Sequence, residues 1–318
     1  MNRDDLDRRA FLKAATGTSL LAALGGAVSD WAKAAESAGE IPMRTLGRTG
    51  LRVSIIGLGG FHVGLPEREE DSIALVHRAL DLGVNFFDNA DSYQEGNAEE
   101  RMGKALEGRR QKTVLMTKVE SRDAKGSREA LEKSLRRLRT DYLDIWQFHA
   151  VGKMEDLNKI LAPDGALETA EQAKKEGKIR FIGITSHTKP EVLLAAIKRY
   201  PFDVAQMPIN VVDPHFMSFR KTVVDEAVQR NVGVIGMKPL GRGNIVSLQV
   251  ATASEAFAWV WSQPVSVAVS GCEWKDAVDY NVYLAKAFKP MPESEQAALL
   301  ERTKRHAGVG IEIYKNWA

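Results

Sequence analysis

The sequence lacks several features that would place it in a specialised class of protein. Its 318 residues include one cysteine, Cys272, so an internal disulfide framework is excluded. We interpret this lone thiol as a small apolar packing residue rather than a nucleophile. The formal net charge is only +2, and Lys and Arg are interleaved with Asp and Glu, so no basic face for nucleic acid is indicated. With 44% apolar and 27% charged residues, the chain can bury a large core.

Motifs of two familiar kinds, one for binding dinucleotides and one for binding metals, are also missing. The glycine cluster at 57–62 (GLGGFH) does not have the spacing of the G-x-G-x-x-G fingerprint, which argues against an open, doubly wound dinucleotide-binding sheet. The cluster is explained equally well by a turn or by close backbone packing. Neither H-x-H nor H-x-x-E-H occurs, so a metal-dependent hydrolase or lyase is the weaker alternative, and no metal site is predicted.

The N-terminus looks like a twin-arginine export signal. Residues 8–13 (RRAFLK) precede a modestly apolar stretch at 14–28, and small residues at 32–34 (AKA) offer a peptidase site. We therefore predict a signal peptide over 1–34, cleavage after Ala34, and a single domain over 35–318. The expected partner is the twin-arginine export machinery and the expected location is the periplasm, or another compartment reached by that route. The apolar stretch is short and interrupted by glycine, so no stable membrane span is expected after processing. The alternative is an amphipathic helix of the folded protein.

Apolar and amphipathic segments alternate along the rest of the chain. Two short runs, Met43–Leu46 and Leu51–Ser54, flank a glycine-bounded turn and predict a β-hairpin. Eight buried strands are then predicted at 55–58, 84–87, 114–116, 142–148, 179–184, 204–207, 232–237 and 265–269. Amphipathic helical patterns lie between them, for example at 69–82, 127–139, 168–177 and 221–230. Eight strands, each followed by a helix, predict an α/β fold: a (β/α)8 TIM barrel with an N-terminal β-hairpin.

Four polar residues follow predicted strands and suggest a proton-transfer site. They are Asp88, Tyr93, Lys118 and His149. Active sites of such barrels lie at the carboxyl ends of the strands, where these residues are expected to meet. A phenol with a pKa near 10 is a weak acid at neutral pH, but a neighbouring ammonium lowers that pKa and a carboxylate can hold the ammonium charged. Each residue also has an ordinary structural explanation, such as a helix cap, a surface ion pair or a packed core imidazole.

These residues carry a resemblance to the aldo-keto reductase family. The chain is similar to that family from about Met43 to Phe288, and the segment 85–93 (NFFDNADSY) keeps the family's spacing from its acid to its tyrosine. Residues 117–118 (TK) and 147–149 (QFH) match the segments that carry the family's lysine and histidine. The resemblance implies reversible hydride transfer between a nicotinamide cofactor, usually NADPH with NADH possible, and a small-molecule aldehyde or ketone.

The resemblance also implies a role for each of the four residues. Tyr93 would protonate the carbonyl oxygen, Lys118 would lower the pKa of Tyr93, Asp88 would anchor Lys118, and His149 would orient the carbonyl. The cofactor would supply the hydride and the barrel would supply position and field.

Further positions are implied for the cofactor and the substrate. The cofactor-binding candidates are Thr185, Ser186, Gln206, Lys238, Pro239, Leu240, Gly241, Arg242, Gly243, Gly271, Lys275 and Asn281. Thr185 and Ser186 stand where the family commonly has serine and asparagine, and Ser270 stands in place of a proline. The candidates for the border of the carbonyl pocket are Phe61, His62 and Trp274. These departures leave open a second interpretation, a nicotinamide-binding regulatory or sensor module without turnover.

Overall fold

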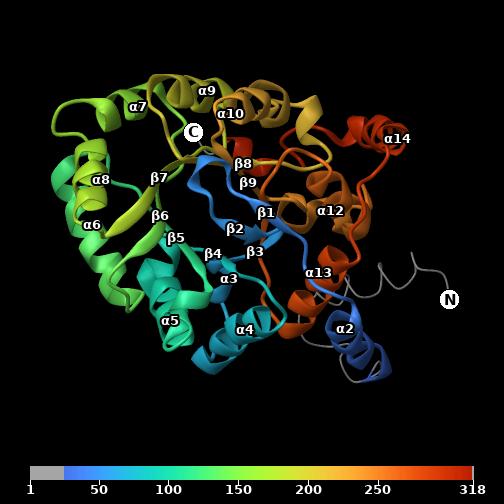
Figure 1. Cartoon of the computed structure of the whole chain (residues 1–318). Helices are drawn as coiled ribbons and strands as arrows, with labels where there is room; N and C mark the ends of the chain where they lie inside the picture. The colour runs from blue at the N-terminus through green and yellow to red at the C-terminus, as the bar shows by residue number, and fades with distance from the viewer. Residues whose placement is uncertain (1–24, 317–318) are drawn as a thin grey trace.

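Eight parallel strands close into a barrel surrounded by helices. The computed structural model describes residues 25–316, with side chains described from Trp31 onward. The barrel strands are β3 (Ile56–Gly59), β4 (Phe86–Asp88), β5 (Val114–Val119), β6 (Leu143–Phe148), β7 (Ile179–Thr185), β8 (Val204–Pro208), β9 (Gly233–Met237) and β10 (Val267–Ser270). Strand β10 pairs with β3 and so closes the ring, as Figure 1 shows. The predicted TIM barrel is confirmed, and the open doubly wound sheet is wrong for this chain.

Helices follow the strands and form the outer layer (Figure 1). The longer ones are α4 (Glu69–Asp81), α5 (Asn97–Leu106), α6 (Ala124–Arg137), α7 (Met154–Leu161), α8 (Ala166–Lys175), α9 (Pro190–Arg199), α12 (Ala253–Trp261), α13 (Lys275–Lys286) and α14 (Glu293–Thr303). Shorter ones are α3 (Gly60–Val63), α10 (Asp225–Gln229) and α11 (Asn244–Ser247). Local sequence fixes several helix starts. Thr252 and Glu255 form a reciprocal capping box at α12, and three acidic residues in the first turn of α4 complement the helix dipole.

The N-terminal hairpin closes one end of the barrel. It consists of β1 (Met43–Thr45) and β2 (Arg52–Ser54), paired antiparallel as predicted. Leu46 is fully buried and packs with the apolar side chains of the barrel interior. Gly47 has φ +47°, and a Cβ there would overlap the backbone of Gly233, so glycine permits the close approach. Because this end is filled by apolar side chains, the polar residues of the interior gather at the other end.

Helix α2 (Gly25–Ser37) packs beside α13 (Figure 1). The ring of Trp31 contacts Tyr280 and Tyr283, with centroid distances of 4.8 and 5.1 Å, and Glu36 forms a 2.8 Å ion pair with Arg78. The predicted cleavage position after Ala34 therefore falls inside α2. Most of the predicted signal peptide lies outside the described residues.

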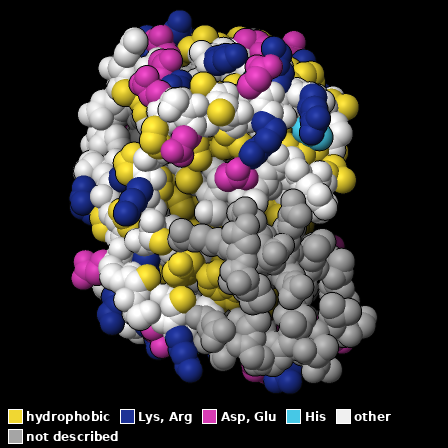
Figure 2. All heavy atoms as spheres, turned by 90° about the vertical axis from the view of Figure 1, so that its right-hand side faces the viewer, with side chains coloured by type: hydrophobic (Ala, Val, Ile, Leu, Met, Phe, Trp, Pro, Cys, Tyr) yellow, Lys and Arg dark blue, Asp and Glu magenta, His cyan; other side chains and the backbone are white. Residues whose placement is uncertain are grey.

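The surface carries charges of both signs. On the face in Figure 2, Lys and Arg are interspersed with Asp and Glu over the upper part of the molecule. Within residues 25–316, none of the helices is both long and apolar enough to cross a membrane.

Candidate active site

The structure brings Asp88, Tyr93, Lys118 and His149 together at the carboxyl ends of β4, β5 and β6. Asp88 is the last residue of β4, and Lys118 lies inside β5, paired in register with Gln147 of β6. The prediction that both follow their strands is therefore wrong in detail: β5 continues through Val119 because it stays hydrogen-bonded to β6. As a result the Lys118 side chain is buried at the mouth of the barrel.

Lys118 is the hub of this group, with only 1% of its side chain exposed. Its ammonium donates a short hydrogen bond to Asp88 Oδ1, another to Asn89 O at 2.6 Å, and a third to the Tyr93 hydroxyl at 3.3 Å. Burial acts to lower the pKa of Lys118, but Asp88 and Tyr93 raise it above its usual value. The ammonium is therefore charged at neutral pH and faces the phenol oxygen.

Tyr93 begins a tight turn, η3 (Tyr93–Gly96), in which Gln94 and Glu95 adopt left-handed backbone angles. Burial raises the pKa of the Tyr93 phenol, while Lys118 acts in the opposite direction. As expected, the interaction of the Lys118 ammonium with Tyr93, taken by itself, lowers the pKa of the phenol. In this structure burial outweighs it, so the net pKa of Tyr93 is raised, which corrects the expectation.

His149 follows β6 and lies beside Tyr93. The two ring centroids are 5.8 Å apart and the planes are nearly perpendicular, at 78°. Burial lowers the pKa of His149, with Glu120 acting against it, so the imidazole is neutral at pH 7. His149 Nδ1 lies 3.5 Å from Glu120 Oε1, and Ser92 donates a 2.7 Å hydrogen bond to the same carboxylate oxygen. Sequence reasoning missed Glu120, because no motif marks it.

The side-chain amide of Gln206 is hydrogen-bonded to the group of residues around Lys118. Its Nε2 donates to Asp88 Oδ2 at 2.9 Å, and its Oε1 accepts from Gln147 Nε2 at 3.2 Å. Of the two hydroxyl candidates after Gly183, Thr185 Oγ1 accepts a hydrogen bond from Ala150 N at 2.8 Å. Ser186 Oγ is buried and has no hydrogen-bond partner within the described part of the chain. A buried hydroxyl of this kind is suited to a polar ligand.

The loop after β9 carries the basic candidates. Lys238 and Arg242 have positive φ angles, 56° and 60°, as does Gly241. Burial, with Lys118 and Arg242 acting in the same direction, lowers the pKa of Lys238 to about 8. Pro239 and Leu240 connect these residues, and Gly243, with φ 91°, caps α11.

His62 lies against this basic region, over Gly271. A Cβ at Gly271 would overlap the imidazole ring of His62, so that glycine makes room for the ring. Burial lowers the pKa of His62 to about 4, with Lys238 and Arg242 contributing. His62 was expected to border the carbonyl pocket, and its ring packs edge-on against Phe61, with the two centroids 5.4 Å apart.

The remaining candidates are dispersed around the loop after β10. Asn281 on α13 points back to the strand end and donates to Ser270 Oγ at 3.2 Å. Lys275 is exposed at the first position of α13, and Trp274 precedes it as the N-cap. Phe61, with 40% of its surface exposed, packs edge-on against Tyr93 at 5.4 Å. Trp274 makes no ring contact with Tyr93 or Phe61 among the described aromatic residues, so only Phe61 of the two is placed beside the phenol.

Comparison with known proteins identifies the family. The sequence profile described as the Aldo/keto reductase family matches residues 55–296. The 6-dehydroglucose reductase of Novosphingobium aromaticivorans is 30% identical over 254 residues, which are 73% of this chain and 81% of that protein. The chain belongs to the aldo/keto reductase family and is an oxidoreductase of that family.

Two solved structures have the same fold. The holo form of aldo-keto reductase AKR11C1 from Bacillus halodurans superposes with a TM-score of 0.73 at 26% identity, covering 86% of this chain and 100% of that one. An aldo-keto reductase from Klebsiella pneumoniae, solved in complex with NADPH, superposes with a TM-score of 0.69 at 23% identity over 84% of this chain and 96% of that one. At this identity the second likeness shows the fold alone.

Proposed function

We propose that this protein is an NADPH-dependent reductase that converts an aldehyde or ketone to an alcohol, with Tyr93 as the general acid. The observation that carries the proposal is the buried ammonium of Lys118, which contacts the Asp88 carboxylate and the Tyr93 hydroxyl at the same time. This geometry suits a phenol that gives up its proton during the reaction, because the neighbouring cation stabilises the phenolate that forms.

The residues at the strand ends fit a nicotinamide cofactor. Ser186 offers a buried hydroxyl without a partner among the described residues. Lys238 and Arg242 provide positive charge for phosphate groups. When bound, the cofactor supplies the hydride. We assign Thr185, Ser186 and Gln206 to the carboxamide end, and the loop 238–243 with Gly271, Lys275 and Asn281 to the phosphates and adenine.

The chain's own residues then act on the carbonyl group of the substrate. Tyr93 donates its phenolic proton to the carbonyl oxygen, and Lys118 holds the resulting phenolate while Asp88 keeps Lys118 in place. His149, neutral and adjacent to Tyr93, orients the carbonyl. Phe61 borders the substrate and shields the phenol from water. One relative reported above is a 6-dehydroglucose reductase, so we include sugar-derived ketones, with aromatic aldehydes and dicarbonyls, among the candidate substrates.

The test of this proposal is NADPH oxidation by the full chain across that set of carbonyl compounds, with Tyr93→Phe measured beside it. We expect the turnover of the variant to be lower by about two orders of magnitude or more, since positioned proton donors typically contribute that much. Cofactor binding should be unchanged. NADPH binding without turnover on any carbonyl would favour the sensor interpretation, and absence of binding would contradict the cofactor assignment.

We also propose that the protein is exported in folded form through the twin-arginine route, on the basis of residues 8–13. Such export suits a protein that binds its cofactor before crossing the membrane. The cofactor would then be recycled by oxidation of a second substrate or by a partner. Cell fractionation, with Arg8→Lys/Arg9→Lys as the control variant, tests the route, and the mass of the exported chain shows where it is cleaved. Wild-type protein found only in the cytoplasm, or exported protein without cofactor, would contradict this proposal.

A further inference from the structure

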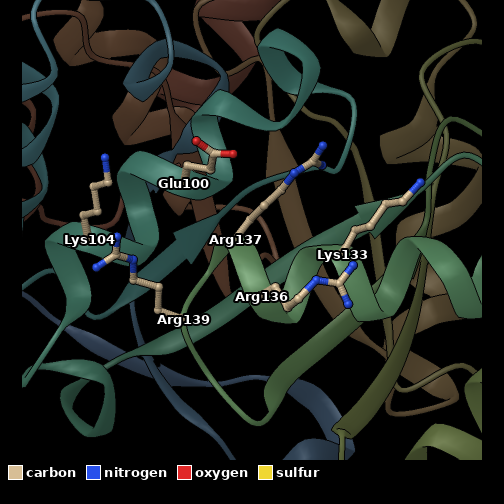
Figure 3. Close-up of a pocket in the computed structure, with 6 residues that line it drawn as sticks. All are labelled: Glu100, Lys104, Lys133, Arg136, Arg137 and Arg139. Atoms are coloured by element: carbon tan, nitrogen blue, oxygen red, sulfur yellow. The ribbon is translucent and has the colours of Figure 1, made fainter.

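A pocket of about 360 Å³ lies on the outside of the barrel, between α5 and α6 (Figure 3). Six residues line it, and Figure 3 labels them: Glu100 and Lys104 from α5, Lys133, Arg136 and Arg137 from α6, and Arg139 just after α6. Five cationic side chains thus surround the space together with one carboxylate. The charges on the face in Figure 2 are, by contrast, mixed in sign.

Three of the five cations already have carboxylate partners. Lys104 pairs with Glu69 at 2.7 Å, Arg139 with Glu107 at 2.8 Å, and Arg137 with the buried Glu99 at 3.4 Å. Within residues 31–316, neither Lys133 nor Arg136 forms an ion pair. They lie one turn apart on α6, and both are exposed.

The dipole of α6 explains part of this arrangement, since cations are stabilised near the carboxyl end of a helix. It does not explain why Lys104 on α5 and Arg139 beyond α6 face the same space. Like charges one helical turn apart also repel one another. An anion in the pocket would relieve that repulsion and complete the pairing of Lys133 and Arg136.

We propose that this pocket binds a small phosphorylated hydroxy compound that carries at least two anionic groups. Its volume lies near the lower end of the range for small-ligand sites, which is about 300 to 1,000 Å³. Lysine and arginine are the usual donors to phosphate oxygens. Glu100, the single carboxylate of the lining, is placed to accept a hydrogen bond from a hydroxyl of the same ligand.

Arg137 connects the pocket to the turn that carries Tyr93. Its guanidinium donates to Asp91 O at 3.2 Å and to Glu95 O at 3.0 Å, so it holds the backbone on both sides of Tyr93. It also packs against Gly96, where a Cβ would overlap the guanidinium. A phosphate beside Arg137 would compete for these donors and loosen the turn. The pocket ligand would then lower the turnover of the proposed reductase, a consequence that rests on the proposed function.

Calorimetric titration with inorganic pyrophosphate tests the site. The full chain is saturated with NADPH beforehand, so that the basic loop after β9 does not capture the probe. We expect Lys133→Ala/Arg136→Ala to weaken binding at least about tenfold, since each charge-assisted contact to phosphate contributes strongly. The control is Lys159→Ala/Lys175→Ala, which removes the same charge from exposed positions on α7 and α8 and should leave the affinity within about twofold.

The outcomes separate the site from its competitors. Equal affinity in wild type and Lys133→Ala/Arg136→Ala would overturn the site. Attachment to vesicles containing an anionic phospholipid, without binding of soluble pyrophosphate, would overturn it in favour of a membrane surface. Titration needs no turnover, so a protein that binds NADPH without turnover gives the same test. If NADPH does not bind, Lys238→Ala/Arg242→Ala is added to every protein compared, so that the loop after β9 does not capture the probe.

Hydrogen–deuterium exchange over residues 91–96 tests the link through Arg137. We expect the amides of this turn to exchange at least about threefold faster when pyrophosphate is bound, because fewer hydrogen bonds then hold it. The Lys133→Ala/Arg136→Ala variant should show no such change. Unchanged exchange in wild type with pyrophosphate bound would overturn the coupling.

Discussion

Two buried lysines, Lys118 in the barrel mouth and Lys315 near the C-terminus, form matching arrangements with different consequences. Each ammonium uses three contacts. Lys118 contacts the Asp88 carboxylate, a backbone carbonyl and the Tyr93 hydroxyl. Lys315 contacts Asp213 at 2.9 Å, the carbonyl of Phe216 at 2.6 Å and the Glu312 carboxylate at 2.8 Å. They differ in the third acceptor, a neutral phenol in one centre and a second carboxylate in the other.

This difference indicates what each centre can do. The phenol beside Lys118 can become an anion during a reaction, and the ammonium then gains a second negative partner. Around Lys315 both carboxylates already contact the ammonium in the folded protein, without any reaction. Burial raises the pKa of one of them, Glu312. That centre fastens the C-terminal segment over the loop after β8, where Asn210 also donates to Glu312 and to Tyr314. The first centre suits catalysis, and the second suits structural stability.

The largest expected effect is on kcat, which should depend on Lys118 and much less on Lys315. Lys118→Met should reduce kcat for carbonyl reduction by about 10² to 10⁴, because the phenolate loses its cation. Lys315→Met, a change of the same type, should reduce kcat by less than about tenfold, because Lys315 contacts no part of the proposed reaction. Steady-state kinetics at a temperature where both variants are folded gives the comparison. Similar losses in the two variants would show that the C-terminal centre also takes part in catalysis.

The second prediction concerns stability. Lys315→Met leaves two buried carboxylates without their cation, and we expect the free energy of unfolding to fall by about 3–5 kcal/mol. Urea unfolding followed by circular dichroism measures the change. The triple variant Lys315→Met/Asp213→Asn/Glu312→Gln removes the stranded charges and should recover much of the loss. If the triple variant is no more stable than Lys315→Met, packing rather than charge holds the segment.

A third lysine, Lys238, extends the comparison of Lys118 and Lys315 to the pH dependence of cofactor binding. The pKa of Lys238 is lowered to about 8, first by burial and then by Lys118 and Arg242. Lys238 is therefore charged below about pH 8 and loses its charge as the pH rises, while a bound phosphate would raise its pKa. NADPH affinity should be constant below this pH and fall above it, by up to about tenfold per pH unit. Lys238→Arg should keep the affinity constant to higher pH, measured by fluorescence titration, and an identical decline in the variant would assign the effect to another group.

The barrel and the four-residue group could be predicted because each depends on local sequence. Apolar runs mark the strands, and adjacent parallel strands place Asp88, Lys118 and His149 side by side whatever the loops do. The predicted ends were less accurate. Lys118 lies within β5 because hydrogen bonding to β6, rather than the apolar run, decides where that strand stops.

Contacts between distant segments could not be predicted. Lys315 and Asp213 are 102 positions apart in the sequence. The segment around Lys315 has no periodicity that would indicate a buried ion pair. The same is true of Arg137, which sits in an ordinary charged stretch of α6 and yet holds the turn of Tyr93. The pKa of Tyr93 shows a further limit. The neighbouring cation was foreseen, but the degree of burial that outweighs it is set by the folded surroundings.

The smallest expected effect concerns Glu120, a carboxylate that is far more exposed than those of the two lysine centres, at 59% of its side chain. Hydrogen bonding with His149 lowers the pKa of Glu120 to about 2, so it is ionised over the working pH range. Its charge opposes the lowering of the His149 pKa by burial. Glu120→Gln should therefore shift the acidic limb of the kcat/KM profile to lower pH, by less than about one pH unit because the carboxylate is solvent-screened. Glu120→Asp should restore the wild-type profile in part. A shift to higher pH would mean that the acidic limb does not report the ionisation of His149.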